Sequence, residues 1–191
     1  MTANRESKLP ALLLVDVQKA FHDPSWGVRN NPDAVKNMAR LLNAWRDTRR
    51  PVIHVKHNST SPNSTLRPGL PGNDFMDEVA PRDGEAQFEK SVNSAFIGTT
   101  LETYLRCHGI ESLVIVGFTT DHCVSTTTRM AGNLGFDVTL VADATATFDR
   151  TSADGRHYTA EEIHDIHLAS LDGEFCEVKT TAEVLAASVS S

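Results

Sequence analysis

Short apolar segments alternate with amphipathic segments along most of this chain. The first apolar segment, Ala11 to Val17, is too short for a confident helix and carries no period, which is typical of a buried parallel strand. The segment Ser112 to Gly117 has the same character. The pattern predicts the remaining strands at Pro51 to His57, Phe88 to Lys90, Asp137 to Ala142 and Phe175 to Val178.

The segments between these strands carry helical signals. After an Asn31-Pro32 start, an i, i+3, i+4, i+7 stripe is formed by Val35, Met38, Ala39, Leu42 and Trp45. A further helix is expected from about Val124 to Leu134, ending at Gly135. Capping boxes predict the other helix starts at Thr99 with Glu102, Thr159 with Glu162, and Thr180 with Glu183.

Strands separated by helices need crossover connections, which produce a parallel sheet covered on both faces. The expected fold class is therefore α/β, a three-layer α/β/α sandwich with a mainly parallel central sheet. Residues 58–84 are rich in proline and glycine and are expected to form a long irregular loop with a functional role. With no internal repeat or linker, residues 1–191 are expected to form a single domain.

Composition narrows the functional classes. The 191 residues include 18 Lys and Arg against 25 Asp and Glu, a net charge of −7 that argues against nucleic-acid binding. No apolar run approaches the ~20 residues of a membrane span, and no signal peptide is evident, so we expect a cytoplasmic protein without membrane contact. Three cysteines without CxxC spacing argue against a disulfide framework and a thiolate zinc site.

Three polar residues are expected at the carboxyl edge of the sheet, where open α/β folds bind ligands. Asp16 lies near the end of the first strand, Lys90 ends a short strand, and Cys123 follows a central strand at a helix start. Each alone has an ordinary explanation as a loop anchor, a surface charge or a core thiol. Together they supply a nucleophile, a base and a cation that would stabilise a thiolate.

Three stretches carry a specific resemblance. LLLVDVQKAF at 12–21, EKSVNSAFIGTTLETYL at 89–105 and VIVGFTTDHCVSTTTRMAGNLGFDVTLVADATATF at 114–148 together resemble the isochorismatase-like cysteine hydrolase superfamily. The resemblance implies a catalytic triad of Asp16, Lys90 and Cys123, and a non-proline cis peptide at Phe118-Thr119. It also implies a homo-oligomer, a dimer or larger.

The expected reaction is cleavage of a carbonyl–nitrogen bond of a small molecule through a thioester, without a cofactor. The backbone N–H groups of Thr119 and Cys123 would hold the oxyanion. Substrate contacts are expected from Gln18, Phe21, Trp26, His57 and Phe118. Phe148, Cys107 and Cys176 are expected to be core residues. No metal-ligand role is expected for His164 or His167, and no Cys–His dyad is expected from His122.

Several alternatives remain open at this stage. Family members that cleave a vinyl ether commonly lack the cysteine, which is present here, and nicotinamidases carry an Asp-x-His metal pair that is missing beside His54 and His57. We therefore expect no metal, and a weak likeness to streptothricin hydrolase favours the metal-free members. From other classes, a catalytically silent binding protein and a flavodoxin-like redox protein also have the expected sheet architecture.

Overall fold

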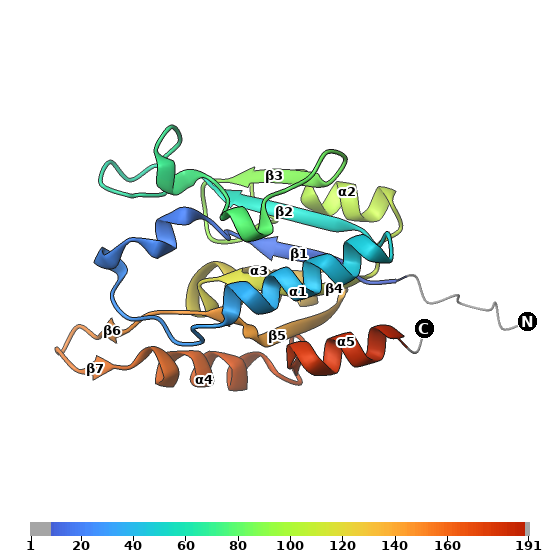
Figure 1. Ribbon diagram of the computed structural model, residues 1–191. Coiled ribbons are helices and arrows are strands. Elements are labelled where there is room, and N and C mark those ends of the chain that lie inside the picture. The colour runs from blue at the N-terminus through green and yellow to red at the C-terminus, as the bar shows by residue number, and fades with distance from the viewer. Residues whose placement is uncertain (1–8, 190–191) are drawn as a thin grey trace, which may run out of the picture.

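Six parallel strands form the central sheet of the protein, whose computed structural model describes residues 9–189 (Figure 1). The spatial order of the strands is β3-β2-β1-β4-β5-β8, so β1 and β4 are neighbours at the centre. In chain order the strands are β1 (Ala11–Val15), β2 (Val52–His57), β3 (Ala86–Lys90), β4 (Ser112–Phe118), β5 (Asp137–Ala146) and β8 (Glu177–Lys179). The predicted mainly parallel sheet is confirmed.

Helices cover both faces of this sheet, which confirms the three-layer arrangement. The helices are α1 (Ala34–Asp47), α2 (Leu101–Cys107), α3 (Ser125–Asn133), α4 (Ala160–Leu171) and α5 (Thr181–Val189). In Figure 1, α1 and α5 lie in front of the sheet, and α2 and α3 lie behind it. Two apolar clusters fill the two interfaces, one with side chains of α1 and α5, the other with side chains of α2, α3 and α4.

The strand β1 is buried on both faces, which explains its unbroken apolar sequence. Leu12 and Leu14 join the cluster beneath α1, whereas Leu13 and Val15 join the cluster on the other face. All four side chains are essentially inaccessible to solvent. A strand in this position needs apolar residues at every place, because alternate residues point to opposite faces.

Two of the three predicted capping boxes are present. Thr159 and Glu162 exchange hydrogen bonds at the start of α4, and Thr180 and Glu183 do the same before α5. The prediction at Thr99 is wrong: its hydroxyl donates to Ala95 O at 2.6 Å, and α2 begins after Thr100. A hydroxyl two residues before the helix is also within reach of a preceding carbonyl, a competing bond that spacing alone does not reveal.

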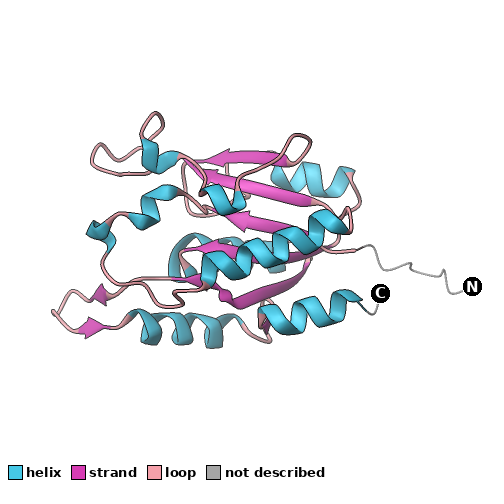
Figure 2. Cartoon of the chain, viewed as in Figure 1, coloured by secondary structure: helices cyan, strands magenta, loops and turns pink. Residues whose placement is uncertain are grey.

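The carboxyl ends of the strands carry most of the loops (Figure 2). This edge holds the short helical turns Lys19–His22 and Pro24–Trp26 after β1, and the first part of the loop over residues 58–84, which then crosses to the amino end of β3. The loop contains two further turns, Pro71–Asn73 and Asp77–Val79. A small antiparallel pair that the pattern did not predict, β6 (Arg150–Thr151) and β7 (His157–Tyr158), extends beyond β5.

One close approach between β1 and β4 requires glycine. Gly117 pairs with Val15 and has φ 132°, and a Cβ at this position would lie 2.0 Å from the Val15 carbonyl oxygen. Only glycine fits this backbone conformation and this contact. The two strand ends that carry Asp16 and the Cys123 loop are thereby brought side by side.

The cysteine predictions are only partly correct. Cys107 is exposed at the end of α2, so its assignment to the core is wrong, because the apolar stripe of this short helix consists of Leu101 and Leu105. Cys176 is partly buried and packs against the cluster that includes α3. Within residues 9–189, no helix is both long enough and apolar enough to cross a membrane.

Candidate active site

Asp16 and Lys90 form a buried ion pair at the carboxyl edge of the sheet. Asp16 directly follows β1 with φ 54°, a left-handed conformation that Asp tolerates better than most residues. Lys90 is the last residue of β3 and reaches across the end of β2. Its Nζ lies 2.6 Å from Asp16 Oδ2, and the two side chains are 0% and 1% exposed.

Cys123 lies next to this pair, in the turn of π-helix over Thr120–Val124 that precedes α3. Its Sγ is partly buried and lies 3.8 Å from Asn93 Oδ1. A sulfur, an oxygen and a nitrogen atom of Cys123, Asp16 and His57 lie within 4.8 Å of one another. Asp16 Oδ1 is buried and has no hydrogen-bond partner among the described residues, so this oxygen is available to take a proton. The structure thus brings the three predicted triad residues together.

His57 completes the polar cluster at the end of β2. Its Nδ1 lies 3.0 Å from Lys90 Nζ and 3.9 Å from Asp16 Oδ2. Burial and the neighbouring Lys90 charge lower the pKa of His57 to about 4, so the imidazole is neutral at neutral pH. Because an ammonium group only donates hydrogen bonds, Nδ1 accepts from Lys90 and the ring proton is on Nε2.

The electrostatics of the cluster differ from the expectation of a lysine-stabilised resting thiolate. Burial raises the pKa of the Cys123 thiol well above its ordinary value, the charge of Asp16 raises it further, and Lys90 opposes both effects. Burial also raises the pKa of the Asp16 carboxyl, against the lowering effect of Lys90. One lysine neutralises one anion, and Asp16 already holds it. The resting state is therefore a neutral thiol beside an ion pair.

A cavity of about 210 Å³ opens over this cluster. The predicted residues that line it are Asp16, Phe21, Trp26, His57, Thr119 and Cys123. Lys90 is not among the lining residues, because its side chain lies beneath Asp16 and His57. Pockets that enclose drug-sized ligands typically have volumes of about 300–1,000 Å³, so this cavity fits a smaller molecule.

Gln18 does not line the cavity, so its predicted contact with substrate is wrong. Its side chain is fully buried and clamps the loops instead. Nε2 donates to His57 O and Asn73 O, and Oε1 accepts from His57 N at 2.8 Å. The amide is thereby committed to backbone groups, which fixes the end of β2 where His57 lies.

Phe118 is also wrongly assigned to the pocket. It is 0% exposed and packs behind Phe21, with 5.1 Å between ring centroids. Phe21 and Trp26, which do face the cavity, are supported on the other side by Phe148, a core residue as predicted. A residue at the end of a central strand is covered by the loops that follow, and the sequence does not indicate which aromatic ring becomes outermost.

Five further residues line the cavity that the sequence did not single out for it. They are Ser59, Ser64, Leu66, Asn93 and His122. The first three belong to the proline- and glycine-rich loop. The sequence predicted a functional role for this loop but did not indicate which of its residues would line the cavity. Asn93 lies three residues after Lys90, within the second motif of the resemblance. Its place in this motif was the sequence feature that could have identified it as a cavity residue.

The turn that carries Cys123 is anchored on both sides by hydrogen bonds that are buried or partly buried. Thr120 Oγ1 lies 2.9 Å from His164 Nδ1 of α4. Asp121 accepts from Thr147 Oγ1 at 2.6 Å and from Arg150 Nε at 2.7 Å. The peptide bond between Phe118 and Thr119 is cis, at the position that the resemblance indicated. The turn is therefore fixed to the residue that follows β5, to the start of β6 and to α4.

A resident metal ion does not fit this cluster. Asp16, His57 and Cys123 converge closely enough to act as metal ligands. The sequence around His57 did not predict this convergence, because Asp16 and Cys123 come from other strand ends. However, the Lys90 ammonium lies 2.6 Å and 3.0 Å from two of the three, where its charge would repel a cation. These side chains fit the roles of a nucleophile, a base and a cation better than the roles of metal ligands.

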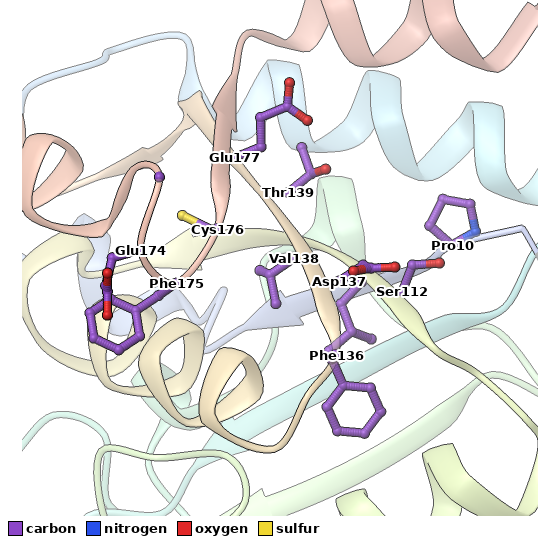
Figure 3. Close-up of a pocket in the computed structure, with 12 residues that line it drawn as sticks. Pro10, Ser112, Phe136, Asp137, Val138, Thr139, Glu174, Phe175, Cys176 and Glu177 are labelled. Carbon is purple, nitrogen blue, oxygen red and sulfur yellow. The ribbon is translucent and has the colours of Figure 1, made fainter.

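A second hollow, of about 510 Å³, lies at the opposite end of the strands (Figure 3). It is lined by the first residues of β4, β5 and β8 and by the segment that precedes β8. Asp137 of β5, Cys176 and Glu177 are among these residues. Burial raises the pKa of the Cys176 thiol to about 12, and no lysine or arginine is among the lining residues. Ligands of parallel α/β sheets bind at the carboxyl ends, so the smaller cavity is the functional candidate.

Comparison with known proteins places the chain in a family. The isochorismatase domain model matches residues 10–183. The chain is 47% identical to YrdC of Bacillus subtilis, an uncharacterised isochorismatase family protein, over 92% of this chain and 94% of that protein. A crystal structure of an isochorismatase-family protein from Chromobacterium violaceum superposes with a TM-score of 0.94 at 51% identity, covering 97% and 96% of the two chains.

The weak likeness to streptothricin hydrolase corresponds to a distant relative. The streptothricin hydrolase of Streptomyces noursei is 34% identical over 75% of this chain, but the match covers only 51% of that enzyme. The family match spans nearly the whole chain and includes every element that contributes to the cavity over Asp16 and Cys123. The chain is a member of the isochorismatase family of hydrolases.

Proposed function

We propose that the protein is a cysteine hydrolase that cleaves a carbonyl–nitrogen bond of a small molecule through a thioester acyl-enzyme. The observation that carries the proposal is the convergence of the Cys123 thiol, the unpartnered Asp16 Oδ1 and the Lys90 ammonium at one small cavity. Relatives of the chain include a nicotinamidase and a maleamate amidohydrolase, whose names describe amide cleavage.

In the first half-reaction, Asp16 takes the thiol proton as Cys123 Sγ attacks the carbonyl carbon. The buried carboxylate is a stronger base than an exposed one, which offsets the raised pKa of the thiol. Backbone N–H groups of Thr119 and Cys123, two residues that line the cavity, would hold the oxyanion. Protonated Asp16 then gives its proton to the leaving nitrogen, and the thioester remains.

In the second half-reaction, Asp16 removes a proton from water, and the resulting hydroxide attacks the thioester carbonyl. The carbon–sulfur bond breaks, and Asp16 returns the proton to the sulfur as the acid leaves. Lys90 keeps one positive charge beside Asp16 throughout. It holds the carboxylate through Oδ2, so that Oδ1 is left for proton transfer.

The proposal is tested by trapping the acyl-enzyme. A panel of small amides, carbamoyl compounds and lactams is screened for release of ammonia or amine, and the best substrate is mixed with enzyme and quenched in acid within milliseconds. Intact mass spectrometry should show the acyl mass on the peptide that contains Cys123. Cys123→Ala should lose both the adduct and turnover, whereas Cys176→Ala should keep both. Turnover by Cys123→Ala would refute the nucleophile.

A vinyl ether hydrolase of the isochorismatase type is the alternative within the family. It needs an acid to protonate the substrate but has no use for a nucleophilic thiol, and Cys123 lies in the cavity beside an available base. The thiol therefore favours acyl transfer. Cytoplasmic location and assembly into a homo-oligomer remain expectations from the sequence and the resemblance.

A further inference from the structure

We infer that the cavity selects small amides that carry no net charge and discriminates against amides that bear a carboxylate. The inference deepens the proposed function, on which it rests, by naming the class of substrate. The inference rests on two observations: the side chains that line the cavity, and the pairing of the charges of Asp16 and Lys90 beneath the cavity.

The cavity has an apolar wall and a polar wall. The polar wall includes His122, whose Nε2 lies 3.4 Å from the carboxylate oxygen Oδ2 of Asp121. Phe21, Trp26 and Leu66 form the apolar wall. Hydroxyl and amide groups of Ser59, Ser64 and Asn93 supply neutral donors and acceptors. Among the described residues that line the cavity there is no lysine or arginine.

The charges beneath the cavity are already matched. Lys90 is the nearest cation, but its buried ammonium is bound to Asp16 at 2.6 Å and to His57 at 3.0 Å. His57 is neutral, because burial and Lys90 lower its pKa to about 4. Arg29 lies behind the aromatic wall, with its guanidinium carbon 5.1 Å from the centroid of the Phe118 ring, and does not line the cavity.

A carboxylate on the substrate would therefore lose water without gaining an opposite charge. Burial of an unpaired anion is unfavourable, and the carboxylate of Asp16 would repel it at short range. The net charge of −7 on the whole chain also disfavours the approach of anions. An uncharged amide meets none of these penalties, because serine and asparagine side chains can replace its lost hydrogen bonds with water.

Two alkylating reagents test this inference without a known substrate. Iodoacetamide and iodoacetate deliver groups of similar size that differ in charge, and exposed Cys107 provides an internal reference in the same chain. The ratio of the iodoacetamide rate to the iodoacetate rate, measured by peptide mass spectrometry at neutral pH, should be at least tenfold larger at Cys123 than at Cys107. Equal ratios at the two thiols would overturn the inference. If the protonated Cys123 thiol reacts with neither reagent, the comparison of methyl succinamate with succinamate decides it.

A positive charge placed in the cavity should weaken the selectivity against anions. Ser64→Lys adds an ammonium to the polar wall and should lower the Cys123 ratio at least threefold. Ser61→Lys is the matched control, because Ser61 is exposed in the same loop and does not line the cavity, and it should leave the ratio unchanged. Ser59→Lys repeats the test from a second lining position if Ser64→Lys does not fold. An unchanged ratio in the folded cavity variants would contradict the inference.

Turnover separates this inference from the proposed function. Methyl succinamate and succinamate share the same primary amide, and only the second bears a carboxylate. The kcat/KM for methyl succinamate should exceed that for succinamate at least tenfold. Release of ammonia from both at equal kcat/KM would refute the charge selection but leave the proposed function intact. Selective alkylation of Cys123 with no acyl-enzyme from any amide would support the charge selection of the cavity but refute the proposed function.

Discussion

Lys90 Nζ and Asp16 Oδ2 lie 2.6 Å apart in an ion pair that is almost completely shielded from solvent. The pair links the edge strand β3 to the central strand β1 across the end of β2. A buried pair of this kind gains little net stability over an apolar pair, but removal of one partner leaves an uncompensated charge. Variants that remove one or both charges can therefore separate the contribution of the pair to stability from its contribution to catalysis.

Lys90→Met should lower the free energy of unfolding by about 3–5 kcal/mol, because the Asp16 carboxylate would remain buried without a partner. The double variant Asp16→Asn/Lys90→Met has no charge at the site and should recover most of this loss. Urea denaturation checks both values. The double variant should still be inactive, and any substantial activity would contradict the proposed mechanism.

Asp16→Asn should reduce kcat at least a hundredfold, because an amide can neither take the thiol proton nor return one to the leaving nitrogen. Steady-state turnover of the best amide from the screen is the measurement. Asp137→Asn serves as control, since Asp137 lies in the second hollow at the opposite edge, and it should keep full activity. Retention of more than roughly a tenth of kcat in Asp16→Asn, a smaller loss than removal of a general base causes, would require another base.

Thr120→Val should destabilise the fold by about 1–3 kcal/mol and also lower kcat, because buried His164 Nδ1 loses its hydrogen-bond partner at the turn that carries Cys123. Thr128→Val is the matched control in α3. Its buried hydroxyl has no hydrogen-bond partner in the described structure, so its replacement should cost nothing or be stabilising. Thermal unfolding and kcat are compared for the two variants, and equal effects would contradict an anchoring role for Thr120.

Glu85→Gln should destabilise the protein at pH 7 by about 1–3 kcal/mol, in the range of hydrogen bonds to charged groups. Burial opposes the ionisation of Glu85, but bonds from Arg46, the Arg82 N–H and His54 outweigh it and lower its pKa to about 2. A carboxyl with a lowered pKa stabilises the folded state above its unfolded pKa of about 4.3, and this contribution is lost as the pH falls to about 2.

The difference between the wild type and Glu85→Gln should therefore be constant at neutral pH and shrink between about pH 4.3 and pH 2. Urea denaturation over this range is the measurement. Glu111→Gln, at an exposed glutamate, is the control variant for removal of a surface carboxylate. A difference that stays constant down to pH 2 would mean that Glu85 does not carry the lowered pKa.

Activity on any identified substrate should be unaffected by extensive chelation, because Lys90 and the backbone donors supply the positive charge that a metal would otherwise provide. Elemental analysis of the purified protein should find well under one metal per chain. Stoichiometric zinc or iron, lost with activity on chelation and restored on its return, would revive the nicotinamidase alternative. It would also require Lys90 to move away from Asp16 and His57.

Much of the candidate site follows from local sequence pattern. An apolar run of five to seven residues must be buried on both faces, and parallel strands must place their carboxyl ends at one edge. Asp16 and Cys123 follow such runs, and Lys90 ends a short edge strand of alternating burial, so the sequence by itself placed all three at the carboxyl edge of the sheet. Thr159 with Glu162 is equally local, since both partners of the capping box lie within one helical turn.

What only the tertiary structure decided depends on contacts between distant segments. Gln18 was expected to face substrate, but backbone groups of His57 and Asn73 take up its amide. Ser59 and Ser64 line the cavity because the loop after β2 folds back over the edge of the sheet, a path that no local period specifies. The protonation of Cys123 depends on burial and on a carboxylate 107 positions away in the chain. Periodicity shows which residues are buried, whereas their partners are fixed only when the loops close around them.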